Sequence, residues 1–306
     1  MHRTEQPGGA RHWFAGDRLH LQHGPINLVL SVETEHANCR RLAEQAAMRR
    51  FRTVLAELVP DLALLKMPCG SCSAVPKSAI SRRMHSATRI FAAQFFVTPM
   101  AAVAGAVADE MLSTILNQVR IDKIMVNNGG DIALHLRGDK QCGISVRSLQ
   151  NRELARIRLT PGDDVGGAAT SGGGGKSLTF GIADSVTALA CSASVADVAA
   201  TLIANAVDLP GHPAIRRKAA CEIDESSDLG SRKVVVGCGP LVDRDVETAL
   251  NRGHAVAQNM TDAGHIRAAA LFLRDKRAVV CAGDLDSRRV FRFSDGRTAG
   301  TGGSGV

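Results

Sequence analysis

The segment that most constrains the fold is a helix-forming run whose first turns hold almost only small side chains. After Thr98-Pro99 the chain reads MAAVAGAVADEMLSTIL, residues 100–116. Proline suits the first turn of a helix, and Ala, Val and Gly give that helix a shallow surface. We therefore expect another backbone segment or a ligand to approach this helix closely.

Composition limits the classes of protein to be considered. The chain has 306 residues, of which 45% are hydrophobic and 22% charged, a balance typical of a globular protein with a large core. Lys and Arg outnumber Asp and Glu by 37 to 30, and the charge of +7 favours ligands that carry phosphate. Aromatic residues make up only 3%, which argues against base-stacking surfaces for nucleic acid. The clustered Arg49, Arg50 and Arg52 are accordingly interpreted as a solvated helix face.

The expected location is the cytoplasm. The N-terminal residues do not resemble a signal peptide, and we find no run approaching the roughly 18 apolar residues that span a bilayer. Eight cysteines are spread through strand-like and helix-like runs, which suits reduced thiols. Cys69 and Cys72 form one CxxC motif, but without a second motif they are interpreted as loop thiols and not as a zinc site.

Periodicity predicts alternating helices and strands over most of the chain. Hydrophobic spacing indicates helices within 35–58, 99–116, 192–207 and 243–260. Strand-forming residues indicate a hairpin over 18–33 and strands within 123–136, 143–148, 155–160, 184–191, 233–237 and 265–281. Residues 60–83 and the Gly-rich 163–181 are expected to be loops. We expect residues 18–282 to form a single domain or two interleaved lobes, between a flexible N-terminus, 1–17, and a disordered tail, 283–306.

Asp197 and Thr201 are candidate metal ligands. They are four residues apart and so lie on one face of the helix expected over 192–207. A carboxylate and a hydroxyl on one face can bind a single oxygen-seeking cation, for which Mg²⁺ is the natural candidate. The alternative is that Asp197 complements the helix dipole and that Thr201 bonds back to its own backbone. Spacing alone leaves both interpretations open.

Two glycine-containing segments are candidate nucleotide contacts. The run Asn127-Asn128-Gly129-Gly130-Asp131 lies between strand-forming residues, where a turn with positive φ is the simpler explanation and close approach to a nucleotide is the alternative. Thr170-Ser171, four glycines and Lys176-Ser177 nearly spell a phosphate-binding P-loop. Thr170 stands where the first glycine belongs, and no helix clearly follows, so a P-loop NTPase is not expected.

Four segments, in this order, resemble the ApbE fold family, and most closely a smaller branch of ApbE-related proteins. They read TPMAAVAGAVAD, NNGGDIALHL, TSGGGGKSLTFGIADSVTALA and SVADVAATLIANAV, and the similarity runs from about residue 18 to about residue 280. The resemblance implies an α+β fold, related to the T-fold, in which mixed antiparallel sheets pack with helices and small-residue helices line a central cleft.

The resemblance also implies site residues. ApbE-type FAD:protein FMN transferases bind Mg²⁺ through an Asp and a Thr of the last motif helix and a main-chain oxygen of the small-residue helix. The corresponding metal ligands here are Asp197, Thr201 and Ala104. The family's GGD turn and TSG segment line the flavin nucleotide site, which implies contacts from Asn128, Gly129, Gly130, Asp131, Thr170, Ser171 and Gly172.

Two departures from the transferases bear on the activity. The transferases carry a Lys in the small-residue helix, in GGIAKGY, and an HxxDPxTG motif between TSG and SVT. Here the helix reads AVAGAVA, and only 13 residues separate Gly172 from Val186. The shorter loop lacks side chains that contact substrate in the transferases.

The leading hypothesis is an Mg²⁺-dependent flavin-handling enzyme that transfers FMN from FAD to a Thr or Ser of an acceptor flavoprotein. Because the Lys and the His motif are missing, two alternatives stay open: an enzyme that acts on a small anionic or heterocyclic metabolite, and a non-catalytic flavin- or nucleotide-binding protein. We expect neither a nucleic acid nor a membrane as partner, and a homo-oligomer is left open.

Overall fold

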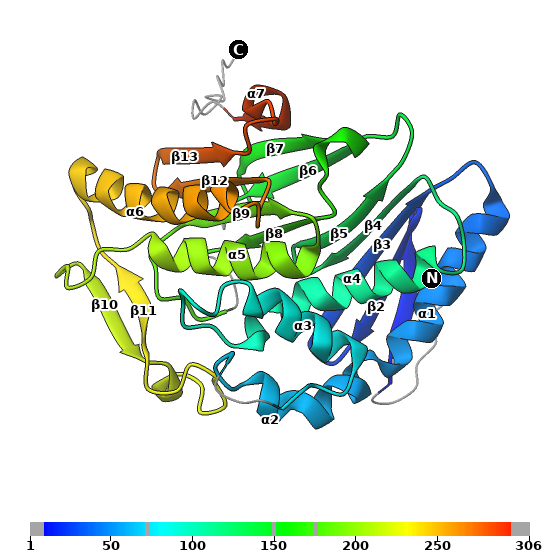
Figure 1. Ribbon diagram of the computed structural model, residues 1–306, viewed down its shortest axis with the longest axis horizontal. Helices are drawn as coiled ribbons and strands as arrows, with labels where there is room; N and C mark the ends of the chain where they lie inside the picture. The colour runs from blue at the N-terminus through cyan, green and yellow to red at the C-terminus, as the bar shows by residue number, and fades with distance from the viewer. Residues whose placement is uncertain (1–8, 71–73, 149–150, 174–176, 295–306) are drawn as a thin grey trace, which may run out of the picture.

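Strand-forming runs from both halves of the chain build one large antiparallel sheet (Figure 1). The computed structural model describes residues 9–70, 74–148, 151–173 and 177–294. Nine strands pair in the order β1-β2-β3-β4-β5-β8-β9-β12-β13, and every neighbouring pair is antiparallel. A sheet ordered β14-β7-β6 and the pair β10-β11 hold the other described strands. The predicted α+β class with antiparallel sheets is confirmed.

The elements follow one another along the chain with short connections. The strands are β1 Arg11–Ala15, β2 Arg18–His23, β3 Ile26–Glu33, β4 Lys123–Asn128, β5 Asp131–Leu136, β6 Cys142–Arg147, β7 Glu153–Leu159, β8 Gly167–Ser171, β9 Ser185–Ala190, β10 Ile215–Ala219, β11 Lys233–Cys238, β12 Ala268–Leu273, β13 Lys276–Cys281 and β14 Phe291–Phe293. The α-helices are α1 Ala37–Leu58, α2 Leu62–Leu65, α3 Ala79–Arg89, α4 Val103–Leu116, α5 Ala193–Ala206, α6 Asp243–Asp262 and α7 Ser287–Val290.

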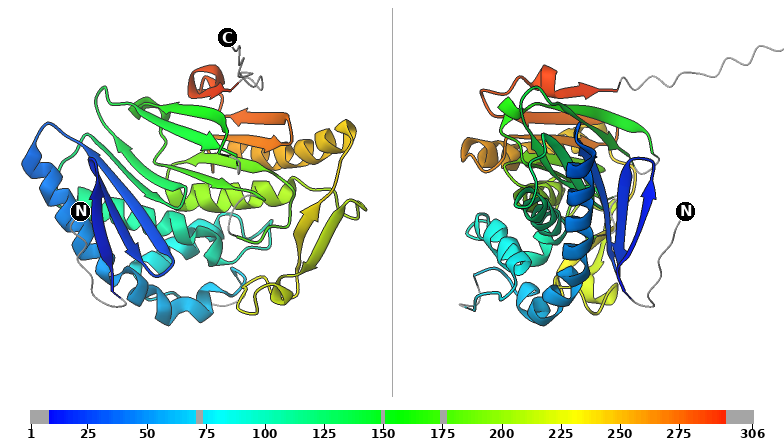
Figure 2. Two further views of the ribbon diagram at one scale, coloured as in Figure 1. Left: turned by 180° about the vertical axis from the view of Figure 1, so that it is seen from behind. Right: turned by 90° about the vertical axis from the view of Figure 1, so that its right-hand side faces the viewer.

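The large sheet is the middle of three layers. Helix α1 packs on β2 and β3, α4 on β4 and β5, α5 on β8 and β9, and α6 on β12 and β13, so the helices cover one face (Figure 2). The small sheet β14-β7-β6 covers part of the other face and encloses a second hydrophobic core. All residues of the central strands β9 and β12 are buried, whereas β6 alternates buried and exposed residues as a sheet with one wet face does.

Helices α4 and α5 approach each other closely, as the small residues of the first predict. A Cβ atom built on Gly105 would lie 2.3 Å from the carbonyl oxygen of Ala193 at the start of α5. Neighbouring residues of the same helix, Ala106 and Ala108, are fully buried. The position therefore accepts glycine only, because any side chain would push the two helices apart.

Strand β8 lies within residues that the sequence predicts to be a loop. Glycine usually weakens a strand, and Gly166 and Gly167 stand at its start. In the structure both pass directly against the connection from β9 to α5. A Cβ atom on Gly167 would lie 2.1 Å from the backbone nitrogen of Ala193. Close packing on α5, and not turn formation, therefore requires these glycines.

Regular structure also extends beyond both predicted domain boundaries. Strand β1, within the expected flexible N-terminus 1–17, pairs with β2 over its whole length. Helix α7 and strand β14 lie within the expected tail 283–306, where Val290 and Phe291 enter the second core. Together with Leu285, these apolar side chains fix a segment that is polar on average. Residues 1–8 and 295–306 lie outside the described residues.

One segment meets the length and composition of a membrane-spanning helix, contrary to the expectation from sequence. Pro99–Leu116 has a mean hydropathy of 1.3 over 18 residues, and half of it is buried inside the protein. Its two acids are engaged within the fold, Asp109 at the start of α5 and Glu110 in ion pairs. These are the contacts of a core helix.

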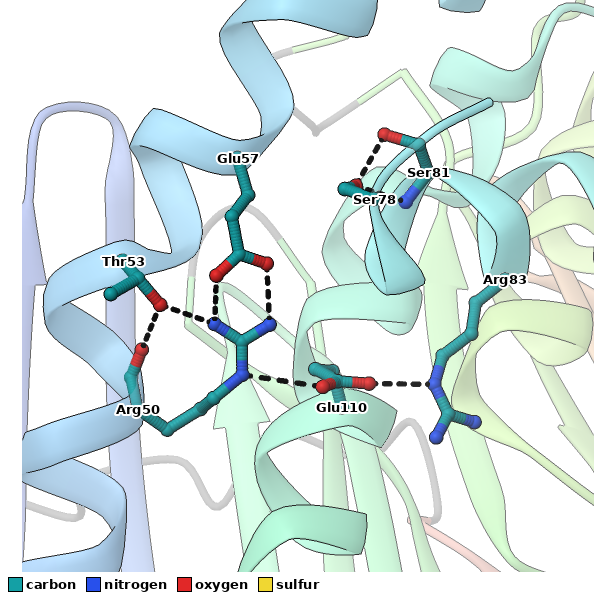
Figure 3. A network of polar contacts seen from close by, with 7 residues as sticks. All are labelled: Arg50, Thr53, Glu57, Ser78, Ser81, Arg83 and Glu110. Carbon is teal, nitrogen blue, oxygen red and sulfur yellow. Dashed lines mark hydrogen bonds and ion pairs between the residues drawn. The ribbon is translucent and has the colours of Figure 1, made fainter. Parts of the chain in front are cut away.

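Ion pairs tie the helical layer together (Figure 3). The guanidinium of Arg50 on α1 donates to both oxygens of Glu57 at 2.7 Å each, and to Glu110 of α4 at 3.2 Å. Glu110 also accepts from Arg83 of α3 at 3.0 Å. Only 14% of the Arg50 side chain is exposed. Within the expected solvated cluster, Arg50 is therefore a structural residue that joins α1 to α4, and Glu110 links both to α3.

The Gly105→Ala substitution tests the close approach of α4 and α5. We expect a loss of about 3 kcal/mol or more in the free energy of unfolding, because the new methyl group would overlap backbone atoms that cannot turn aside. Gly143→Ala is the matched control. Gly143 is an exposed residue of β6, and a Cβ atom built on it would meet nothing within 4 Å. Chemical denaturation of both variants measures the difference. Equal stabilities of the two variants would contradict the packing described.

Candidate functional site

The site begins where α4 and α5 cap each other. The first N–H groups of a helix have no partner within the helix and attract negative charge. At the start of α5, the N–H groups of Ala193 and Ser194 donate to the two oxygens of Asp109, each at 2.9 Å. At the start of α4, the N–H of Gly105 donates to Asp197 of α5 at 3.0 Å. Asp197 thus complements the dipole of α4 and not that of its own helix.

The predicted metal ligands line one cavity. This cavity, called the carboxylate cavity below, has a volume of about 500 Å³ and a wall that includes Ala104, Asp131, Asp197 and Thr201. Asp131 follows the glycine turn between β4 and β5. Together with Phe180, which also lines the cavity, these residues come from all four segments that carry the family resemblance. Both carboxylates are half-buried. The structure therefore brings the two residues of α5 and the Asp of the GGD turn together at one place.

Burial leaves these two carboxylates electrostatically unfavourable. Burial away from water raises the pKa of Asp131 to about 7. A hydrogen bond from the Thr170 N–H acts in the opposite direction but does not cancel this effect. Loss of solvent, and then the nearby charge of Asp131, raise the pKa of Asp197 well above its ordinary value. Two acids that face the same cavity repel each other when both are ionised. A bound cation would remove that repulsion.

The hydroxyl of Thr201 is available to a ligand. In the described part of the chain it makes no hydrogen bond, so the alternative in which it bonds back to its helix does not hold in this structure. One turn further along α5, Asn205 accepts hydrogen bonds from the Thr179 hydroxyl and the Phe180 N–H at 3.0 and 2.9 Å. Asp197, Thr201 and Asn205 therefore form one polar stripe on an otherwise apolar helix.

The donor set suits a cation that prefers oxygen. Within the described residues no three His, Cys, Asp or Glu side chains gather into a metal cluster. On the side of α4 and α5 the cavity offers two carboxylates and one unpartnered hydroxyl, from Asp131, Asp197 and Thr201. The other two acids of the wall, Asp224 and Asp228, accept hydrogen bonds from Ser226 and Thr98. Mg²⁺ commonly binds to one or two carboxylates and completes its shell with water and phosphate oxygens. These residues fit that ion.

The glycine turn has the conformation that its sequence predicts. Gly129 and Gly130 have φ values of +69° and +119°, and Asn128 pairs with Asp131 across the two-residue loop. The N–H of Gly130 donates to the side chain of Asn127 at 2.9 Å. The side-chain amide of Asn128 donates to the carbonyl oxygen of Ala104 at 3.1 Å, which fixes the turn to α4. The turn interpretation accounts for both glycines without a ligand.

Most of the remaining predicted flavin contacts line a different cavity. This turn cavity, of about 300 Å³, has in its wall Gly129, Gly130, Thr170, Ser171 and Gly172. It lies beside β6 of the small sheet, whereas the carboxylate cavity lies beside α4 and α5. Asp131 lines only the carboxylate cavity, and Asn128 lines neither. The structure therefore divides the predicted flavin set, and the binding roles stay predictions.

Two further sequence motifs fall partly outside the described residues. Lys176 of the near P-loop and Cys72 of the CxxC motif both do so. Gly172 has a φ of +148° and packs against the carbonyl oxygen of Asp184, 2.8 Å from where a Cβ atom would be. Burial raises the pKa of the Cys69 thiol, which favours the unreactive protonated form.

Comparison with known proteins gives the family. A family model described as AbpE bacteria matches residues 11–284. The chain belongs to this family. The resemblance to ApbE-related proteins predicted from the four motifs is thereby confirmed.

Relatives of this AbpE-family chain occur among archaeal proteins. The UPF0280 protein of Methanothrix thermoacetophila is 36% identical over 190 residues, which cover 60% of this chain and 75% of that protein. The UPF0280 protein of Methanobrevibacter smithii is 39% identical over 133 residues, which cover 42% of this chain and 52% of that protein. The chain thus spans about half the length of the second relative.

Solved structures with a similar course of the chain carry the ApbE name. The flavin transferase ApbE from Vibrio cholerae is 14% identical, with a TM-score of 0.39 and coverage of 90% of this chain and 98% of that one. The ApbE protein from Thermotoga maritima is 12% identical, with a TM-score of 0.46 and coverage of 90% and 96%.

Several residues that line the carboxylate cavity of this AbpE-family chain were not predicted from the sequence. Phe96 and Phe180 lie 6.5 Å apart between ring centroids and give the carboxylate cavity an aromatic wall. Lys66 and the segment 224–229 close it from another side, where Lys66 donates to the carbonyl oxygen of Ser226. Only the spacing of Asn205, eight residues after Asp197, was a usable signal. Phe180 lies within the third motif, but Phe96, Lys66 and the segment 224–229 come from distant parts of the chain and share no pattern.

The raised pKa of Asp131 predicts how stability changes with pH when no metal is present. Its folded-state pKa of about 7 exceeds the ordinary value of 3.8, so the folded protein binds the proton more tightly than the unfolded chain. Stability should therefore fall as pH rises from about 4 to about 7, by an amount that we put on the order of 1 kcal/mol because the cavity is open to solvent. Asp131→Asn should flatten this fall.

Thermal unfolding between pH 5 and pH 8 in the presence of EDTA measures the effect. Asp139→Asn, at an exposed turn position, is the control and should keep the wild-type pH profile. If Asp131→Asn and wild type lose the same stability over this range, the carboxylate of Asp131 is not destabilised as described.

Proposed function

We propose that this protein is an Mg²⁺-dependent flavin-handling enzyme that moves FMN from FAD to a Thr or Ser hydroxyl of an acceptor flavoprotein. The observation that carries the proposal is that Ala104, Asp131, Asp197 and Thr201 line one cavity of about 500 Å³. Membership of the AbpE family supports the same direction.

Asp131, Asp197 and Thr201 would hold the metal. When bound, Mg²⁺ neutralises charge on a pyrophosphate as its phosphoryl bond breaks. The role of the chain is to keep the two carboxylates in place. Asp197 is fixed by the N–H of Gly105, and the carboxylate of Asp131 accepts a hydrogen bond from the backbone of Thr170. The backbone N–H of Ala104 acts on the Asp197 carboxylate in the same direction as that of Gly105.

The proposed reaction conserves atoms and charge. The acceptor hydroxyl forms a new phosphoester bond to the FMN phosphate, the bond between the two phosphates of FAD breaks, AMP leaves, and the hydroxyl proton passes to solvent. Apolar residues of the same wall, including Phe96, Phe180 and Leu202, suit the flat rings of a flavin nucleotide. The volume lies within the usual range of ligand pockets.

We further propose a cytoplasmic location. The seven cysteines of the described residues form no disulfide with one another, and burial raises the pKa of the Cys142 and Cys281 thiols. Protonated, unpaired thiols suit a reducing compartment.

Two substitutions separate metal binding from folding. Asp197→Asn keeps an oxygen that can accept from the Gly105 N–H, so the contact of α4 with α5 survives while the negative charge is lost. Thr201→Val keeps the shape of the side chain and breaks no hydrogen bond seen in the described residues. We expect each variant to unfold near the wild-type temperature, but to bind FAD in the presence of Mg²⁺ at least about tenfold more weakly.

Calorimetric titration of the protein with FAD, once in the presence of Mg²⁺ and once in EDTA, measures this binding. Chromatography of the nucleotides measures AMP release. Asp139→Asn should behave as wild type. The proposal fails if the wild-type protein neither binds FAD nor releases AMP with Mg²⁺ and candidate acceptors. Binding without AMP release would favour a flavin carrier over a transferase.

A further inference from the structure

A second cavity next to the proposed site has a different chemistry. This arginine cavity has a volume of about 530 Å³ and shares Ser177 and Leu178 with the carboxylate cavity, so the two adjoin. Residues from four separated parts of the chain form its wall: the segment before β7, the connection from β8 to β9, strand β11, and the end of β12 with the turn that follows it. None of the residues predicted from sequence to bind metal or flavin lines it.

Two arginines provide the positive charge of this cavity. Arg152 precedes β7, and Arg274 lies in the turn between β12 and β13. Within the described chain neither guanidinium forms an ion pair. Other arginines do form one, including Arg50, Arg83, Arg217, Arg267 and Arg289. The guanidinium of Arg274 donates only to the carbonyl oxygens of Cys238 and Gly239, at 3.4 and 3.2 Å.

The backbone of Arg274 holds a conformation that side chains rarely adopt. Its φ of +58° lies in the left-handed region, where glycine or asparagine is usual. The carboxylate of Asp184 accepts a hydrogen bond from the Arg274 N–H and secures the turn. Arg274 is the first residue of the two-residue loop between β12 and β13, where hairpin turns take a positive φ, so the turn fixes where its side chain begins.

The remaining wall is largely uncharged. Asp184 is the acid among the described lining residues, and it is engaged by the backbone of Arg274. Leu154, Ile182 and Phe272 supply an apolar surface. Guanidinium groups that lack a carboxylate partner and lie beside an apolar wall match a ligand with a hydrophobic body and an anionic oxygen group. Arginine binds carboxylate and phosphate through paired N–H donors.

We propose that the arginine cavity binds an organic anion through Arg152 and Arg274, at a site separate from the cation site of the carboxylate cavity. Carboxylate and phosphate share the oxygen geometry that these arginines recognise, and the source of the anion is left to experiment. The proposal does not rest on flavin transfer, and its test uses neither FAD nor Mg²⁺.

The test is calorimetric titration of the full chain in EDTA at constant ionic strength, once with inorganic phosphate and once with succinate. Three variants are compared. Arg152→Gln and Arg274→Asn each remove a guanidinium, and asparagine tolerates the left-handed backbone at position 274. Arg288→Gln removes the same charge from an exposed residue of α7 that does not line the cavity.

We expect wild type to bind at least one probe, and Arg152→Gln and Arg274→Asn each to weaken that binding about tenfold or more, with Arg288→Gln unchanged. Binding of phosphate alone supports a phosphate ester as ligand, and binding of succinate alone supports a carboxylic acid. The proposal is overturned if neither probe binds, or if all three variants weaken binding equally, since net charge would then explain it. If Arg274→Asn fails to fold, Arg152→Gln decides.

Discussion

Two carboxylates hold α4 and α5 in a reciprocal arrangement. Asp109 of α4 accepts hydrogen bonds at the start of α5, and Asp197 of α5 accepts one at the start of α4. Each acid satisfies N–H groups that the partner helix cannot satisfy itself, and each lies where the helix dipole favours negative charge. The arrangement needs near contact of the two helix starts, which Gly105 permits. Every residue of the candidate metal site is placed relative to this pair of helices.

The same arrangement explains why Asp197 can serve in a site at all. A half-buried carboxylate near a second acid is unfavourable unless something compensates it. Part of the compensation comes from the backbone N–H at the start of α4, which acts to lower its pKa against burial and the charge of Asp131. The compensation is incomplete, and the residual repulsion between the two acids would favour binding of the proposed cation. Asp197 would then contribute both to the contact of the two helices and to the proposed site.

Sequence reasoning succeeded where periodicity was strong. The helices that became α1, α4, α5 and α6 and the hairpin of β2 and β3 follow from hydrophobic spacing, and the φ values of Gly129 and Gly130 follow from the turn between two strands. It failed where glycine served packing, as in β8, and where a few apolar residues fixed a polar segment, as in β14. Both errors have one cause: the deciding contacts join residues far apart in the chain.

For the candidate site, the order of four motifs led to Ala104, Asp131, Asp197 and Thr201, which do line one cavity. The arginine cavity was not predictable, because Arg152 and Arg274 belong to no recognisable pattern. In the aromatic wall Phe180 lies within the third motif, but Phe96, its partner, belongs to none. The same motifs did not reveal that Gly129 and Gly130 line the turn cavity whereas the next residue, Asp131, lines the carboxylate cavity.

The pair β10-β11 stands apart from the large sheet at the lower left of Figure 1, yet it helps to enclose both larger cavities. The loop between its strands supplies residues 224–229 to the carboxylate cavity, and β11 supplies residues 235–238 to the arginine cavity. Arg232 lies over the ring of Phe96, at 3.3 Å from its centroid, and joins this hairpin to the main body. The hairpin thus contributes to the walls of both cavities from one side, while Asp131 and Asp197 are held by other elements. If the proposed function holds, insertions or exchanges within the hairpin would change which ligands enter without displacing the two acids.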